Sequence, residues 1–122
     1  MKAHKIVREE LMVSDLDYLT QVLHPTFIEV DECVFFQPHF EPENYEKHWR
    51  VLGVKDRQKV ERTINHLHLG ELTPEPHNQH QLGERIKKVW ADVLNRRFPA
   101  KDFHMRLYQH TGEWVLTLWQ DV

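Results

Sequence analysis

The sequence FHMRLYQH-TG-EWVLTLWQD, residues 103–121, decides the fold class. Apolar and polar residues alternate through both halves, which is typical of strands with one buried face. Thr111 and Gly112 lie between the halves and fit a two-residue turn, because glycine tolerates a positive φ. The stretch therefore predicts an antiparallel hairpin with strands at 103–110 and 113–121.

The register of this hairpin gives it two different faces. Leu107 lies opposite Leu116 and Met105 opposite Leu118, so we expect a core face made of Phe103, Met105, Leu107, Trp114, Leu116 and Leu118. The reverse face carries His104, Arg106, Tyr108, Thr117 and Trp119. Aromatic residues and arginine are enriched where proteins bury binding contacts. The sequence thus predicts a binding surface at His104, Arg106, Tyr108 and Trp119, unless another segment of the chain covers this face.

A long helix should precede the hairpin. Apolar residues keep helical spacing from Leu82 to Phe98, just before Pro99. We expect this helix to pack on the core face of the hairpin. The polar stretch 73–81 contains two prolines and is predicted to be a loop.

The first half of the chain predicts one strand and three shorter helices. Phe27 to Gln37 is rich in Phe, Ile and Val and is bounded by prolines, so it predicts a strand with Ile28, Val30, Val34 and Phe36 toward the core. The helices are expected at 14–23 with Ser14 as N-cap, at 42–52 before Gly53, and at 57–69 with Asp56 as N-cap and Gly70 as the stop. The segment Ile6 to Val13 fits either a strand or a helix.

This order of elements predicts an α+β fold in a single globular domain, residues 1–122. We expect a small antiparallel sheet of three to four strands that includes the C-terminal hairpin. The helices should pack mainly on one face of that sheet.

Composition excludes several protein classes. The 122 residues include 16 Lys and Arg, 19 Asp and Glu, and 10 His, which gives a net charge of −3 at pH 7. No apolar run approaches the length of a membrane span, and charged residues interrupt any signal-peptide core near the N-terminus. The single cysteine, Cys33, cannot form an internal disulfide. These features indicate a cytoplasmic protein.

Histidine density raises the possibility of a metal site. His66, His68, His77 and His80 lie within fifteen positions, and imidazole is a common ligand of zinc. On the expected helix 57–69, however, His66 and His68 would point in divergent directions. Solvated histidines are therefore favoured, with a metal-binding protein or metal-dependent hydrolase that uses these four residues as the alternative.

Two other groups of residues that could take part in catalysis have simpler interpretations. Cys33 follows Asp31 and Glu32, whose charges oppose a reactive thiolate, so a structural cysteine is favoured. Glu29 and Asp31 should alternate onto one strand face, where a solvated surface explains them without catalysis.

Nucleic-acid binding is a further alternative. The helix pair at 45–52 and 57–69 has the outline of a helix-turn-helix, and the reverse face of the hairpin could stack bases. The negative net charge and the absence of an RNA-binding signature weigh against it.

No glycine-rich phosphate loop, nucleophile elbow, zinc-hydrolase helix or dinucleotide fingerprint is present. The sequence therefore favours a non-catalytic protein-interaction or regulatory domain without a cofactor. Its expected partner is another protein or a second copy of itself, and no membrane partner is expected.

Overall fold

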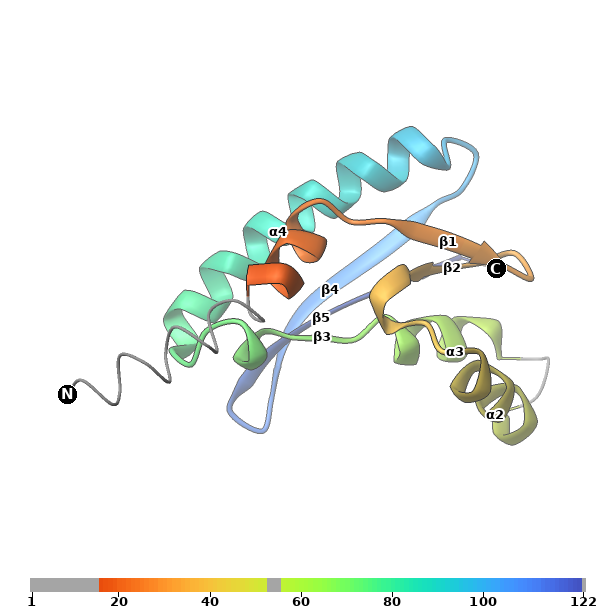
Figure 1. Ribbon diagram of the computed structural model, residues 1–122, viewed down its shortest axis with the longest axis horizontal. Coiled ribbons are helices and arrows are strands. Elements are labelled where there is room, and N and C mark those ends of the chain that lie inside the picture. The colour runs from red at the N-terminus through yellow and green to blue at the C-terminus, as the bar shows by residue number, and fades with distance from the viewer. Residues whose placement is uncertain (1–15, 53–55, 122) are drawn as a thin grey trace.

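The computed structural model describes residues 16–52 and 56–121, and these form an α+β fold with two small antiparallel sheets (Figure 1). Residues 16–23 are helical. The remaining elements, in chain order, are β1 (Phe27–Val30), β2 (Cys33–Phe36), η1 (Gln37–His39), α2 (Pro42–Leu52), α3 (Arg57–Ile64), β3 (Leu67–His68), η2 (Leu69–Glu71), α4 (Pro76–Arg97), β4 (Phe103–His110) and β5 (Glu113–Gln120). The predicted fold class is confirmed. The expectations for Ile6–Val13, Ser14 and Gly53 lie outside the described residues.

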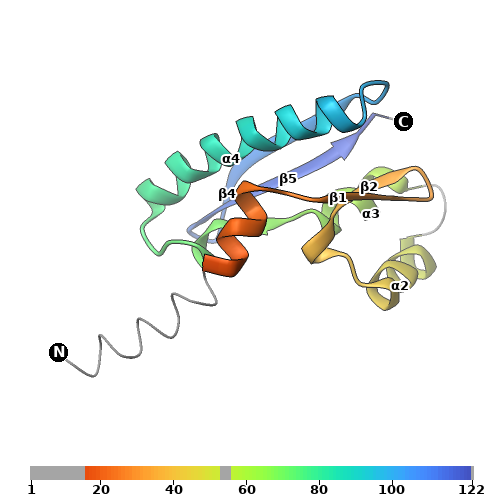
Figure 2. The same cartoon turned by 45° about the horizontal axis from the view of Figure 1, so that its top comes forward.

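The C-terminal hairpin has the predicted register. Leu107 pairs with Leu116 and Met105 with Leu118, and Thr111 and Gly112 form the turn with φ of 49° and 81°. β5 lies in the middle of the three-stranded sheet, between β3 and β4. Figure 2 shows α4 running along this sheet, as the apolar spacing of the helix predicts.

The long helix begins earlier than predicted. α4 starts at Pro76, so the interpretation of 73–81 as a loop is wrong for residues 76–81. Proline is favourable in the first turn because its φ is already helical and its missing N–H has no helical partner there. The polar first turns are held by Gln79, whose buried side chain donates to Thr73 O and accepts from Trp114 N.

The apolar run 27–37 is a hairpin, so the prediction of one long strand is wrong. Asp31 and Glu32 form a two-residue turn with φ of 52° and 70°, and β1 pairs with β2 in a separate sheet. Neither residue is glycine, so the sequence lacks the usual sign of such a turn.

The predicted helix 57–69 is also too long. α3 ends at Ile64, and the next residues bend into the short strand β3, which pairs with β5. Asp56 makes no capping hydrogen bond through its side chain, so its predicted role is wrong. Gly70 lies in η2, where a Cβ would clash with the Glu113 carboxylate.

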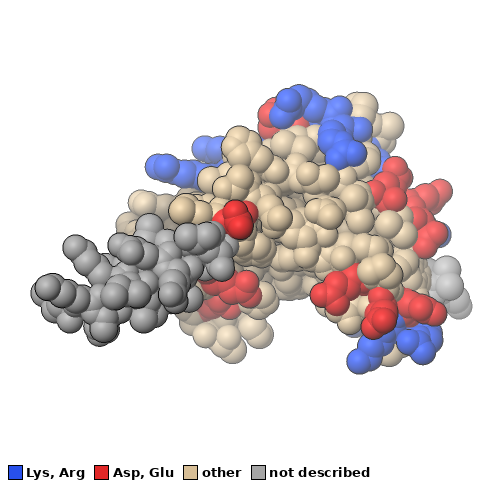
Figure 3. All heavy atoms as spheres, viewed as in Figure 1, with Lys and Arg blue, Asp and Glu red and all other residues tan. Residues whose placement is uncertain are grey.

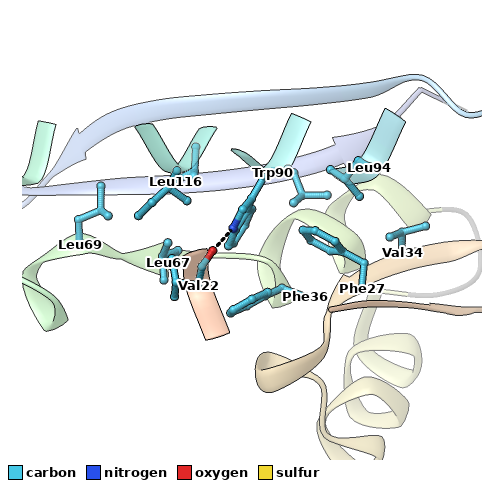
Figure 4. Close-up of a cluster of buried hydrophobic side chains, with 11 residues drawn as sticks. Val22, Phe27, Val34, Phe36, Leu67, Leu69, Trp90, Leu94 and Leu116 are labelled. Carbon is cyan, nitrogen blue, oxygen red and sulfur yellow. Dashed lines mark hydrogen bonds between the residues drawn. The ribbon is translucent and has the colours of Figure 1, made fainter. Parts of the chain in front are cut away.

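The main hydrophobic core lies between α4, the three-stranded sheet, the β1–β2 hairpin and the helix 16–23. Trp90 is fully buried at its centre, and its indole Nε1 donates to Val22 O at 2.8 Å (Figure 4). Its ring meets Phe27 edge-on at 5.4 Å and lies 4.7 Å from Phe36. This one side chain joins the N-terminal helix and the first hairpin to α4.

A second hydrophobic cluster lies on the other side of the β1–β2 hairpin. It contains Cys33, Phe35, Tyr45, Val60 and Ile64, contributed by β2, α2 and α3. Figures 1 and 2 both show the β1–β2 hairpin between α4 on one side and α2 and α3 on the other. All four residues of β2 are therefore buried.

Two side chains of the α3 region join the edges of the two sheets. The Glu61 carboxylate accepts hydrogen bonds from Val34 N on β2 and Gln120 N on β5. The Asn65 amide accepts from Phe36 N and donates to Val34 O, with a longer contact to Leu118 O. Both side chains are buried, and they supply the hydrogen bonds that a neighbouring strand would otherwise make to the backbone groups of these two edges.

No helix in the described part of the chain is long and apolar enough to span a membrane.

Candidate functional site

The reverse face of the β4–β5 hairpin is only partly covered. Val115 and Thr117 are buried there, and the Thr117 hydroxyl donates to Arg62 O of α3 at 2.6 Å. α3 therefore packs against this face, so the helices are not confined to the α4 side of the sheet. His104 and Arg106 remain exposed, while Tyr108 and Trp119 are half-buried.

Trp119 is flanked by two basic side chains. The His104 ring stacks at 5.7 Å with an interplanar angle of 23°, and the Arg62 guanidinium carbon lies 5.4 Å from the indole centroid. His104 comes from β4 and Arg62 from α3, which lie on opposite sides of β5. The imidazole of His104 also pairs with Asp121 at 2.7 Å.

Tyr108 has a similar pair of neighbours. The guanidinium carbon of Arg106 lies 4.9 Å from its ring centroid, and the hydroxyl lies 2.6 Å from His66 Nε2. His66 Nδ1 lies 2.7 Å from Arg62 O, which accepts only, so this nitrogen donates and Nε2 accepts from Tyr108. Burial lowers the pKa of His66, which favours this neutral form.

These contacts define what we call the arginine–aromatic face, made of Arg62, His66, His104, Arg106, Tyr108 and Trp119. Each arginine lies over an aromatic ring, and such cation–π contacts limit the freedom of the side chain. A guanidinium held in this way can still donate hydrogen bonds to carboxylates. The face is thus suited to binding rather than to covalent chemistry.

Sequence analysis assigned four of these six residues to this face, considered His66 only as a metal ligand and missed Arg62. Both come from the segment that was predicted to be one long helix, which would have placed them away from the hairpin. Their role depends on where α3 ends and on the pairing of β3 with β5. No local pattern in the sequence reports either contact.

The four clustered histidines do not form one group. His66 and His68 lie on the reverse face of the sheet with ring centroids 6.3 Å apart, and His68 pairs with Glu113 at 2.8 Å. His80 lies on α4 against Trp114, which faces the opposite side of the sheet, and His77 is exposed on α4. Within residues 16–52 and 56–121, no three His, Cys, Asp or Glu residues are placed to hold a metal ion. The prediction that His66 and His68 point in divergent directions is wrong, because they lie beyond the end of α3 and both face the reverse side of the sheet.

A cavity of about 410 Å³ opens beside the β1–β2 turn, lined in part by Cys33, Glu61, Arg57 and Lys101. Burial raises the pKa of the Cys33 thiol to about 11, so the thiol is protonated at neutral pH and is a poor nucleophile. Burial also raises the pKa of Glu61 against the opposing effect of the hydrogen bonds it accepts. Those bonds join the two sheets, which gives Glu61 a structural role.

The acidic residues at the β1–β2 turn also have partners within the molecule. Because the chain turns at 31–32, Glu29 and Asp31 do not share a strand face as expected. Glu29 pairs with Lys101, the Asp31 carboxylate accepts from the Tyr45 hydroxyl, and Glu32 pairs with Arg57.

A second cavity of about 470 Å³ lies between the helix 16–23, η1, α2 and α3. Its lining includes Tyr18, whose hydroxyl lies 2.6 Å from His39 Nε2, and the carboxylates of Glu41 and Glu71. Burial lowers the pKa of His39 and raises that of Tyr18. The Tyr18 hydroxyl and the His39 imidazole are hydrogen-bonded to each other, and this bond connects the helix 16–23 to η1.

Basic side chains on α4 also bear on the nucleic-acid alternative. Figure 3 shows Lys and Arg at the top of the view, over the C-terminal half of α4, and a smaller basic group at the upper left, while most of the middle of the view carries neither acidic nor basic residues. Arg97 donates to Phe27 O and Arg96 pairs with Asp92. These arginines are therefore engaged in contacts within the molecule.

Comparisons of this chain with protein-family models, with curated proteins and with solved structures find no match.

Proposed function

We propose that the protein is an interaction module that binds another protein through the arginine–aromatic face. One observation carries this proposal: Arg62 and Arg106 are held over Trp119 and Tyr108 on a surface that α3 leaves partly open. Tryptophan, tyrosine and arginine are the residues that most often contribute large binding energies at protein interfaces. The single cysteine supports a cytoplasmic location as part of this proposal.

The geometry favours a protein over a nucleic acid as the partner. Base stacking requires a free aromatic face, whereas His104 and Arg62 flank Trp119, and Arg106 covers Tyr108. The arginines instead offer hydrogen-bond donors at the surface.

A photo-crosslinking residue placed at His104 tests this function in cells. We expect a protein adduct that is lost when Arg62→Ala is added and kept when Arg96→Ala is added. Arg96 is the matched control because it is an exposed arginine on α4, away from the face. Adducts that are mainly nucleic acid, or that survive Arg62→Ala, would contradict the proposal.

A further inference from the structure

We infer that the free edge of β4 binds an extended acidic segment of the partner protein as an added strand. This inference rests on the proposed function, because the added strand would lie directly beside the arginine–aromatic face. It goes further by naming the conformation and the chemistry of the segment that is bound.

The hairpin geometry shows which backbone groups of β4 are free. In a hairpin with a two-residue turn, the pair next to the turn is hydrogen-bonded, here His110 with Glu113, and the bonded pairs alternate from there. His104, Arg106, Tyr108 and His110 therefore direct their backbone groups toward β5. Phe103, Met105, Leu107 and Gln109 direct theirs outward, and no described residue accepts from or donates to them.

Two other strand edges, the outward edges of β5 and β2, are covered by side chains. On β5, Gln79 binds Trp114 N, Asn65 contacts Leu118 O and Glu61 binds Gln120 N, with β3 between them. On β2, Glu61 and Asn65 bind the outward groups of Val34 and Phe36. β4 has eight residues, contains no proline and has no such cover among the described residues. A long uncovered edge is a ready site for strand addition.

The side chains of β4 define the segment that fits. β4 contains Arg106 and two histidines, His104 and His110, but no acidic residue. On its reverse face an added strand would meet His104, Arg106 and Tyr108, which favours acidic side chains there. On the α4 side it would meet the half-buried Phe103, Met105 and Leu107, which favours apolar side chains. The segment is therefore expected to alternate acidic and apolar residues over about eight positions.

The same charges disfavour a second copy of the chain as the occupant. Pairing two β4 edges would bring the Arg106 side chains of both copies onto one face, and like charges across strands are destabilising.

The probe for this inference is the capped peptide Thr-Glu-Val-Glu-Val-Glu-Val-Thr, followed by amide NMR of the full chain. We expect hydrogen exchange to slow at Met105, Leu107 and Gln109, which become bonded, and not at the amides of Arg106 and Tyr108, which already are. A peptide with Lys in place of Glu should bind at least tenfold more weakly, because its charges repel Arg106. N-methylation of the peptide amides that face β4 should also weaken binding about tenfold.

A protein variant gives a second test. Gln109→Pro removes one outward N–H without breaking a bond to β5, and edge strands tolerate proline at such a position. Gln109→Ala is the matched control, because the side chain is exposed and the N–H is kept. We expect the Pro variant to bind the peptide several-fold more weakly than the Ala variant.

The outcomes separate this inference from the proposed function. If the Glu peptide shifts the Arg106 and Trp119 signals but methylation and Gln109→Pro change nothing, the edge inference is wrong and the face still binds. If no peptide binds, or the Lys peptide binds equally well, the edge inference is also wrong, and the His104 adduct alone decides the function. Protection of the outward amides in a peptide-free dimer would identify a second copy as the occupant and overturn the acidic segment.

Discussion

The two hairpins of this protein turn in the same way but are held differently. Both use two residues with positive φ, Asp31 and Glu32 in the β1–β2 hairpin and Thr111 and Gly112 in the β4–β5 hairpin. In the first, β2 is buried on both faces, while the second hairpin has one core face and one partly open face. The comparison shows that a turn without glycine can form when the surrounding structure holds it.

Side chains from α3, β5 and the loop between α4 and β4 hold the first turn. Arg57 donates to Asp31 O, while Lys101 and Gln120 donate to Glu32 O. Among the described residues, no side chain from another element hydrogen-bonds to the second turn, and none lies within 4 Å of where a Cβ of Gly112 would be. The β1–β2 turn therefore depends on tertiary contacts, whereas the β4–β5 turn is favoured by its own sequence.

The largest expected effect separates the buried hairpin from the open one. Phe36→Ala should lower the free energy of unfolding by about 3–5 kcal/mol, because Phe36 is fully buried against Trp90 and Phe27. His110→Ala, at an exposed position of the open hairpin, should change it by less than about 0.5 kcal/mol. Urea unfolding measures both. Similar losses in the two variants would contradict the different burial of the hairpins.

The next effect tests how the buried hairpin is attached to the larger sheet. Asn65→Ala should cost about 2–4 kcal/mol, because it leaves Val34 O and Phe36 N buried without partners. Asn95→Ala on the exposed side of α4 is the matched control and should be close to neutral. If the two variants melt at the same temperature, the hydrogen bonds of Asn65 to β2 contribute nothing to stability.

The two turns themselves should respond to substitution in opposite directions. Glu32→Gly should stabilise the protein by about 0.5–1 kcal/mol, because the relief of left-handed strain exceeds the entropic cost of glycine. The exposed ion pair with Arg57 that is lost contributes little. Gly112→Ala should destabilise by a similar amount. Thermal melts that move both variants in the same direction would show that the first turn is unstrained.

The smallest expected effect is on the pH dependence of the free energy of unfolding. It comes from two partly buried histidines, His39 beside the β1–β2 hairpin and His66 beside the β4–β5 hairpin. The folded state lowers the pKa of His39 and of His66 from 6.5, so unfolding takes up protons as the pH falls. Their contribution to stability is present above the unfolded pKa and is lost as the pH falls toward the folded pKa. The stability advantage of the natural chain over His66→Asn should therefore shrink between about pH 7.5 and about pH 5. His39→Asn should behave likewise, and denaturant titrations at each pH would reveal a constant difference if either histidine titrates normally.

Sequence reasoning succeeded where local signals agree with the fold. The alternation in 103–121, with Gly112 at its turn, gave both strands and their register. It failed at 27–37 and 57–69, where neither Asp31 nor Ile64 carries a local sign that the chain will turn or the helix will end. At those points the tertiary contacts of Arg57, Lys101 and Glu61 decide the backbone.

The candidate site shows the same division. His104, Arg106, Tyr108 and Trp119 follow from strand alternation, because cross-strand neighbours share a face. Arg62 and His66 reach the face from α3 and the bend that follows it, more than forty residues away along the chain. A periodic pattern cannot report contacts of that kind.

The bridge made by Glu61 and Asn65 has a consequence for the order in which the chain can fold. Glu61 and Gln120 are 59 residues apart, and Asn65 and Leu118 are 53 apart. These hydrogen bonds can therefore form only after β5 has been made. Such distant contacts slow folding, because a long loop must close before they form. During synthesis, β2 and α3 leave the ribosome before β5 exists, with the Glu61 carboxylate still lacking its β5 donors. The β1–β2 hairpin is thus joined to the larger sheet only after β5 has been made.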